Sequence, residues 1–126
     1  MPREIIRTEN APAAPPFYSQ AVRAAGLIFV SGTAPVDPGT GKIVEGGVAQ
    51  QVAQCLRNIS AILEAGGSSL DKVVSATLVV AEEDDFPAIN EEWLRWFPTD
   101  PPARQGAKMP VRMAGLKVSI AVVATA

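Results

Sequence analysis

The chain has 126 residues, of which 48% are hydrophobic and 19% charged, so its size and composition are those of one globular domain. The net charge of -2, with basic residues scattered along the chain, gives no electrostatic footprint for nucleic acid. The absence of histidine and the presence of one cysteine exclude a serine–histidine catalytic pair, a histidine-bound metal, a four-cysteine zinc site and an intramolecular disulfide. We therefore expect one domain over residues 1–126 that uses no metal ion or other cofactor.

The location of the protein is predicted from the same sequence. The first residues lack the basic-then-apolar pattern of a secretory signal, and no apolar run reaches the ~18 residues that span a bilayer. We expect a cytoplasmic protein that has neither a membrane nor a nucleic acid as its partner.

Extended segments and turns dominate the first third of the chain. Residues 3–8 predict a short edge strand, and the Ala24-Ala25-Gly26 corner predicts a hairpin that leads into the apolar run 27–34. Asp, Pro and two Gly follow within residues 36–42, which is the composition of a turn.

A helix and a strand are predicted next. Residues 48–65 place apolar side chains three, four and seven apart, which predicts one apolar stripe along a helix. Gly66-Gly67 predict a left-handed cap at its end. Residues 72–81 are apolar or small at both alternating sets of positions, which indicates a central strand buried on both faces.

The last third predicts a second helix and two more strands. The helix begins with Asp84 or Asp85 as its cap, tolerates Pro87 in its first turn and ends before Pro98. Residues 103–112 and 116–125 follow as extended segments. Two helices can cover only one face of the resulting sheet, while several strands also present apolar residues to the other face. We therefore expect self-association, with binding sites at the boundary between subunits.

Without histidine, a functional site must be built from arginine, carboxylates, hydroxyls, amides and backbone groups. Arg104 follows Pro101-Pro102-Ala103 and precedes small residues, so its planar guanidinium suits a bidentate grip on a carboxylate. The alternative interpretation is a surface arginine at the start of a strand.

Three further residues are candidates for ligand contacts, each with a purely structural alternative. Tyr18, the only tyrosine, can close a pocket or pack in the core. Ser31 ends an apolar strand beside a glycine and can bind a ligand oxygen or form a turn. Asn90 on the second helix can orient a loop or a water, or lie exposed.

Two other features favour structural roles. Cys55 lies on the apolar stripe of the first helix, so we interpret it as a core residue and not as a nucleophile. The acidic run 82–85 stands at a helix start, where complementing the helix dipole is a simpler explanation than binding a cation.

Five separated motifs together resemble the Rid family, the reactive intermediate deaminases, also called YjgF-like proteins or the endoribonuclease L-PSP family. The resemblance covers nearly the whole chain, in the order and spacing of the family. The motifs are NAPAAPPFYSQAV (10–22), LIFVSGTAPVDPGTGKIV (27–44), LEAGGSSLDKVV (63–74), DDFPAINEEW (84–93) and PPAR (101–104).

This resemblance implies a chorismate-mutase-like α+β fold, with a six-stranded mixed sheet and two helices on one face, assembled as a homotrimer with clefts between subunits. It also implies hydrolysis of reactive enamine or imine acids to 2-keto acids and ammonia without a cofactor. Arg104 matches the arginine that clamps the substrate carboxylate, and Tyr18, Ser31 and Asn90 match positions that line the cleft.

The chain also departs from the family pattern. Ser119 stands where the family has a glutamate that orients the attacking water, and Gly106 stands where many members have a cysteine. Pro15-Pro16-Phe17 replaces the usual apolar-Gly-Pro before the tyrosine. A positioned general base contributes ~10²–10⁴ in rate, so we expect the family reaction to be weakened or its substrate altered.

Two functional hypotheses follow from these residues. In the first, Arg104 holds a small imine or enamine acid while Ser119 and backbone carbonyls near Gly106 position water. In the second, the protein is a non-catalytic trimer that binds a carboxylate metabolite in a regulatory or chaperone-like role. The sequence offers little support to a third reading, a ribonuclease, because it has no histidine and no basic groove.

Overall fold

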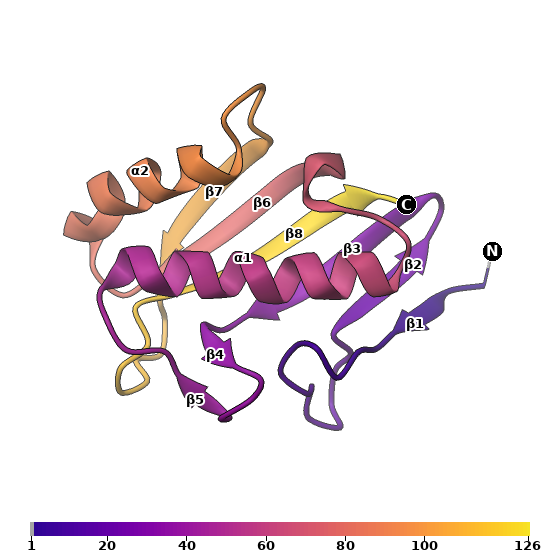
Figure 1. Cartoon of the computed structure of the whole chain (residues 1–126), viewed down its shortest axis with the longest axis horizontal. Helices are drawn as coiled ribbons and strands as arrows, with labels where there is room; N and C mark the ends of the chain where they lie inside the picture. The colour runs from indigo at the N-terminus through magenta and orange to yellow at the C-terminus, as the bar shows by residue number, and fades with distance from the viewer. Residues whose placement is uncertain (1) are drawn as a thin grey trace.

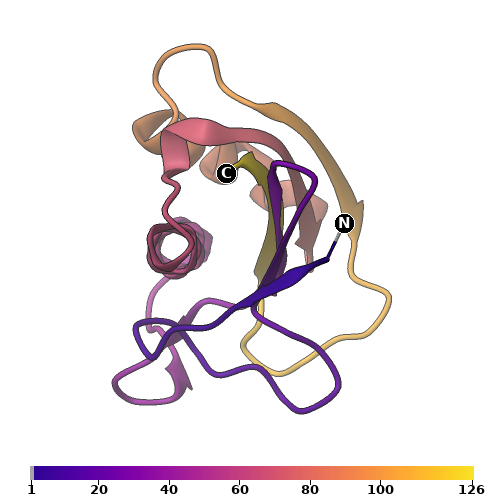
Figure 2. The ribbon, with the colours of Figure 1, turned by 90° about the vertical axis from the view of Figure 1, so that its right-hand side faces the viewer.

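The computed structural model describes residues 2–126, and six of its strands form one curved mixed sheet (Figure 1). The strand order is β1-β2-β3-β8-β6-β7, with β6 and β7 parallel and every other neighbouring pair antiparallel. Helices α1 and α2 lie on the same side of the sheet (Figure 2), which confirms the predicted α+β architecture. The strands of the sheet are β1 (Glu4–Ile6), β2 (Ala21–Ala24), β3 (Leu27–Thr33), β6 (Val73–Val80), β7 (Ala103–Lys108) and β8 (Val118–Thr125); the helices are α1 (Val48–Ala65) and α2 (Phe86–Trp96).

The two tight turns of the first third form as predicted. Ala25 and Gly26 both have positive φ angles, 54° and 76°, which is the conformation of a two-residue hairpin turn between β2 and β3. The turn-rich segment after β3 forms a small separate hairpin of β4 (Val36–Asp37) and β5 (Lys42–Ile43).

Helix α1 has the predicted bounds, and its end has the expected left-handed residue at one glycine only. Gly67 has a φ of +80°, whereas Gly66 has an ordinary φ of -92°. Ser68 N donates to Leu63 O (2.8 Å) and Gly67 N to Glu64 O (3.0 Å), which satisfies two carbonyls of the last turn.

The predicted aspartate cap of α2 is wrong. A short 3₁₀ turn, Glu83–Asp85, leads directly into the helix, and Asp85 at the cap position already has helical angles (φ -79°, ψ -12°) with no side-chain bond to the helix. Because that turn already carries the chain into the helix, Asp85 lacks the extended backbone of a side-chain cap. Pro87 fits the first turn because its missing N–H has no partner to lose there.

The place of β6 also differs from the prediction. β3 and β8 occupy the middle of the sheet, and β6 lies one strand in from the edge strand β7. Alternate residues of β6 are buried beneath the helices, whereas Val74 is 47% exposed on the other side. The sequence pattern indicated two apolar faces, but α1 and α2 of one chain cover only one of them.

The extended segments after α2 are shorter than predicted. β7 ends at Lys108, and the loop from Met109 to Lys117 separates it from β8. Pro110 falls inside this loop, where its missing N–H cannot weaken the sheet.

The core lies between the helices and one face of the sheet. Side chains of α1, α2, β3, β6 and β8 fill it, among them Ile28, Leu56, Leu78 and Ile120, which are fully buried. The opposite face, here called the open face, exposes Ile5 (42%) and Phe29 (45%). Neither helix within residues 2–126 is long and apolar enough to cross a membrane.

Candidate functional site

Arg104 lies on the edge strand β7 and points to the helix-covered side of the sheet. It pairs with Ala76 of β6, whose side chain is buried beneath the helices, and residues paired across parallel strands share a face. The Arg104 side chain is exposed, and its Nη2 donates to Oδ1 of Asn90 at 2.6 Å. Arg104 takes part in none of the ion pairs found among residues 2–126.

Helix α2 orients this guanidinium. Phe86, Asn90 and Trp93 are spaced four and three residues apart, so they form one stripe on the helix. The guanidinium carbon of Arg104 lies 5.4 Å from the ring centre of Trp93 and 6.0 Å from that of Phe86. These cation–π contacts and the Asn90 amide hold one end of the fork and leave the rest available to a ligand.

Gly106 makes room for this arrangement. It pairs with Leu78, so it faces the same side of the sheet as Arg104. A Cβ at Gly106 would lie 3.0 Å from Cζ of Phe86, which means that the phenyl ring occupies the space a side chain would need. We call Phe86, Asn90, Arg104 and Gly106 the edge cluster.

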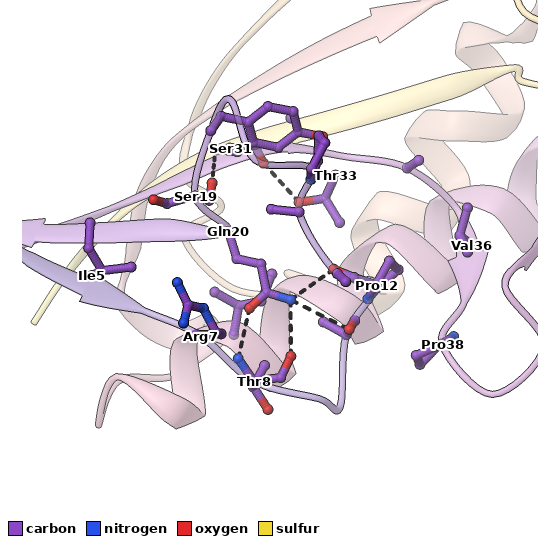
Figure 3. Close-up of a pocket in the computed structure, with 18 of the residues that line it drawn as sticks. Ile5, Arg7, Thr8, Pro12, Ser19, Gln20, Ser31, Thr33, Val36 and Pro38 are labelled. Carbon is purple, nitrogen blue, oxygen red and sulfur yellow. Dashed lines mark hydrogen bonds between the residues drawn. The ribbon is translucent and has the colours of Figure 1, made fainter.

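Tyr18 and Ser31 both line a groove of about 1380 Å³ elsewhere in the chain, where Figure 3 labels Ser31. Tyr18 is 50% exposed, and its ring meets that of Phe17 edge-on, with 5.7 Å between centroids. The Ser31 hydroxyl donates to Ser19 O at 2.6 Å, so it can accept a hydrogen bond from a ligand but has no proton left to donate. We call Tyr18 and Ser31 the groove cluster.

Ser119 belongs to neither cluster. It lies on β8 opposite Val79 of β6, on the open face of the sheet and half-buried. Arg104 therefore points to one side of the sheet and Ser119 to the other.

The sheet itself separates the two clusters within one chain. Ser31 is on β3 and Arg104 on β7, with β8 and β6 between them. Three strand spacings of about 4.8 Å place these backbones about 14 Å apart. The structure thus brings Arg104, Gly106 and Asn90 together, and Tyr18 with Ser31, but one chain cannot place both sets around the same small molecule.

Three residues in and around these clusters are not predicted from the sequence. Phe86 and Trp93 are two of them, although their helical spacing places them on one stripe with Asn90. Gln20 was not singled out at all, and it is a buried amide whose partners are distant in the sequence. The place of Phe86 and Trp93 could have been found from their helical periodicity. The place of Gln20 depends on a loop conformation that no local pattern encodes.

Cys55 takes the core position predicted for it, whereas the acidic run forms ion pairs outside α2 instead of capping that helix. Cys55 is buried, its Sγ donates to Thr33 O at 3.2 Å, and burial raises the pKa of the thiol far above its ordinary value. In the acidic run, Glu82 pairs with Arg112 and Glu83 with Lys108. Over residues 2–126, no group of three His, Cys, Asp or Glu side chains is placed to hold a metal ion.

Comparisons with known proteins give a consistent picture. Residues 8–126 match the family model described as endoribonuclease L-PSP. A RutC family protein of Pyrococcus horikoshii is 44% identical over 102 residues, which are 81% of each chain. The 2-iminobutanoate/2-iminopropanoate deaminase of Bos taurus is 39% identical over 97% of this chain and 89% of its own. The crystal structure of Escherichia coli TdcF with bound serine superposes with a TM-score of 0.89, at 31% identity over 98% of both chains.

Proposed function

The chain belongs to the endoribonuclease L-PSP (Rid) family, and on that premise we propose that it deaminates small reactive enamine or imine carboxylic acids by hydrolysis, giving 2-keto acids and ammonia. The proposed enzyme works without a cofactor, in the cytoplasm, and as a homotrimer whose sites lie in clefts between subunits. Relatives that carry the name of an imine deaminase match almost the full length of the chain, which supports this reaction class.

The observation that carries the proposal is the guanidinium of Arg104. It is exposed, it has no carboxylate partner among residues 2–126, and Asn90 and two aromatic rings fix its direction. A planar cation held in one place binds a carboxylate through two parallel hydrogen bonds. The ligand's carboxylate therefore goes to Arg104, and its reacting carbon lies directly beyond.

The proposed reaction needs little from the protein because the substrate is already electrophilic. An enamine first tautomerises to its imine by moving the N–H proton to the β-carbon. Water then adds to the C=N carbon as one of its protons moves to nitrogen. The hydroxyl proton of the resulting carbinolamine moves to the amino group as the C–N bond breaks, the C=O bond forms and ammonia leaves. A backbone carbonyl near Gly106 and the hydroxyl of Ser119 position the water. Holding the reactants in place supplies most of the rate gain, but a serine hydroxyl cannot take up the proton at neutral pH.

The assembly follows from the separation of the clusters. In the proposed trimer, the edge cluster of one subunit faces Ser119 and the groove cluster of its neighbour, so each site draws on two chains. The apolar side chains exposed on the open face, including Ile5 and Phe29, supply surface that such contacts would bury.

The test uses imino acids generated in the cuvette. An amino-acid oxidase produces them continuously, and semicarbazide traps what has not been hydrolysed. We expect the wild-type protein to lower the trapped signal for at least one small side chain, and Arg104→Met to leave it unchanged. Equal trapping with and without the wild-type protein, across several side chains, would refute the proposed activity.

A second candidate function rests on Ser119. If the missing carboxylate has ended catalysis, the protein is a trimer that only binds a carboxylate metabolite. The serine bound to Escherichia coli TdcF supports a site for small amino-acid-like ligands in such a protein. Here we expect the wild type to bind 2-keto acids without deaminating imines and Ser119→Glu to gain deamination; substantial wild-type activity rules this alternative out.

A further inference from the structure

Gln20 is a buried polar side chain that the proposed reaction does not use. It is only 6% exposed and lies two residues after Tyr18. Its Oε1 accepts from Thr8 N at 2.7 Å, and its Nε2 donates to Thr8 O at 3.0 Å and to Pro12 O at 2.8 Å (Figure 3). One amide thus satisfies backbone groups at two separate points of the preceding loop.

These bonds close the loop that carries Tyr18. The bond from Gln20 to Pro12 joins the two ends of the segment 12–20 at its base. Within the segment, Tyr18 N donates to Pro15 O at 3.4 Å, forming a turn that contains Pro15 and Pro16. Because the prolines stiffen the turn, fixing the base of the loop also fixes the tip.

Strand β3 holds the same segment from the other side. Ser31 N donates to Gln20 O at 3.0 Å, and the Ser31 hydroxyl donates to Ser19 O at 2.6 Å. The residues directly after Tyr18 are therefore held between β3 and the loop that starts at Thr8. The Tyr18 side chain is itself half exposed at the groove, so its own burial does not hold it in place.

We propose that Gln20 is a positioning residue, which holds the 12–20 loop closed and thereby sets the place of Tyr18 in the groove. The role of Tyr18 toward a ligand rests on the proposed function, whereas the effect of Gln20 on Tyr18 does not. Only an amide fits this place, because the side chain must accept from one N–H and donate to two carbonyls. A glutamate would set a negative charge against the carbonyls of Thr8 and Pro12.

The first test observes Tyr18 directly, which is possible because it is the only tyrosine in the chain. Ring-¹³C tyrosine labelling gives its signals alone in a carbon–proton correlation spectrum. We expect Gln20→Leu and Gln20→Glu to move these signals toward the positions of a disordered tyrosine. Gln54→Leu is the matched control, since Gln54 is a similarly buried amide on α1 that bonds Asn58. Unmoved tyrosine signals in folded Gln20→Leu protein would overturn the proposal.

The second test asks whether the placement matters for binding, with 2-oxobutanoate as the probe. Misplacement of a binding group by about 1 Å can cost up to ~10²-fold, so we expect Gln20→Leu to weaken binding by about tenfold. In a Tyr18→Ala background the same change should have no further effect. An equal loss in both backgrounds would show that Gln20 acts through something other than Tyr18 and would overturn the proposal.

The two tests separate the failure of this proposal from that of the function. If the wild type binds no 2-oxobutanoate, the proposed function loses its support and the tyrosine spectrum alone decides the role of Gln20. If Gln20→Leu does not fold, Gln20→Asn keeps the amide but is one methylene too short for both partners. The same shift of the tyrosine signals is expected for it, and their absence overturns the proposal.

Discussion

The edge cluster and the groove cluster are built on different physical principles. The edge cluster places a permanent charge on a strand and holds it by side chains of one helix, so its geometry follows from the registers of β7 and α2. The groove cluster is neutral and lies on a loop, and bonds from side chains to distant backbone atoms shape it. The comparison teaches that the charge proposed to hold the ligand is placed on regular structure, whereas the finer contacts proposed at the groove cluster depend on one loop conformation.

The largest effect is expected from the charge of the edge cluster. Arg104→Met should weaken use of a carboxylate substrate on the order of 10²-fold, because it removes a paired charge-assisted contact. Arg104→Lys should recover only part of this, since it keeps the charge but loses the planar fork. Steady-state kinetics measure both. Arg95→Met, on the solvent side of α2, is the control and should match the wild type; a similar loss there would mean that the effect is not specific to Arg104.

The next prediction tests whether the edge cluster and the groove cluster of one site come from different chains. Tyr18→Ala and Arg104→Met should each have little activity alone. The two variants are unfolded and refolded together as an equal mixture. Random assembly then gives about a quarter of the sites an intact edge cluster from one subunit and an intact groove cluster from its neighbour. We expect about a quarter of the wild-type activity to return. No recovery, in assemblies shown by mass spectrometry to be mixed, would mean that each site is built within one chain.

A smaller effect is expected from the space behind the guanidinium. Gly106→Ala forces its Cβ toward the Phe86 ring, which is packed against the core and cannot move freely. We expect a loss of about 1 kcal/mol in the free energy of unfolding, measured with urea, and several-fold weaker carboxylate binding. Gly32→Ala is the matched control, since nothing lies within 4 Å of its added Cβ. Equal stability of the two variants would show that the Phe86 ring moves aside without lowering the free energy of unfolding.

The smallest effect concerns Cys55, which lies away from both clusters. Its pKa is raised by burial, so the folded chain keeps the thiol proton at a pH where the unfolded chain releases it. The unfolded state then binds fewer protons, and stability falls as pH rises above the ordinary thiol pKa of about 8.5, on the order of 1 kcal/mol per pH unit. Urea titrations of the wild type and Cys55→Ala at pH 7.5 and 9.5 measure the difference. If the stability of both proteins falls by the same amount between these pH values, the effect comes from groups other than Cys55.

Much of the fold is predictable because periodic burial encodes it. The stripe of α1 and the alternation of β8 gave the correct elements, and the turn at Ala25 and Gly26 was visible in composition. The start of α2 was misjudged because an aspartate at a helix start indicates a side-chain cap, while a 3₁₀ turn at Glu83–Asp85 performs the transition instead. The second apolar face of β6 is uncovered in one chain; a pattern of apolar residues does not say which molecule covers them.

The candidate site is predictable only in part, for similar reasons. The place of Arg104 on an edge strand beside Asn90 follows from two periodic elements once their pairing is known. The separation of Arg104 from Ser119 by the sheet depends on the registers that pair Arg104 with Ala76 and Ser119 with Val79, which the sequence of elements does not determine. The loop around Gln20 is held by bonds between residues eight to twelve positions apart, which leave no periodic trace.

The direction of a single hydrogen bond in the groove has a consequence for any molecule that enters it. Because the hydroxyl of the serine at position 31 donates its hydrogen bond to the carbonyl of Ser19, its lone pairs can interact favourably only with a group that donates a hydrogen bond. A carboxylate oxygen would be repelled there, whereas an N–H group could donate a hydrogen bond to this oxygen. An amphoteric ligand that entered this groove would therefore turn its nitrogen end toward β3.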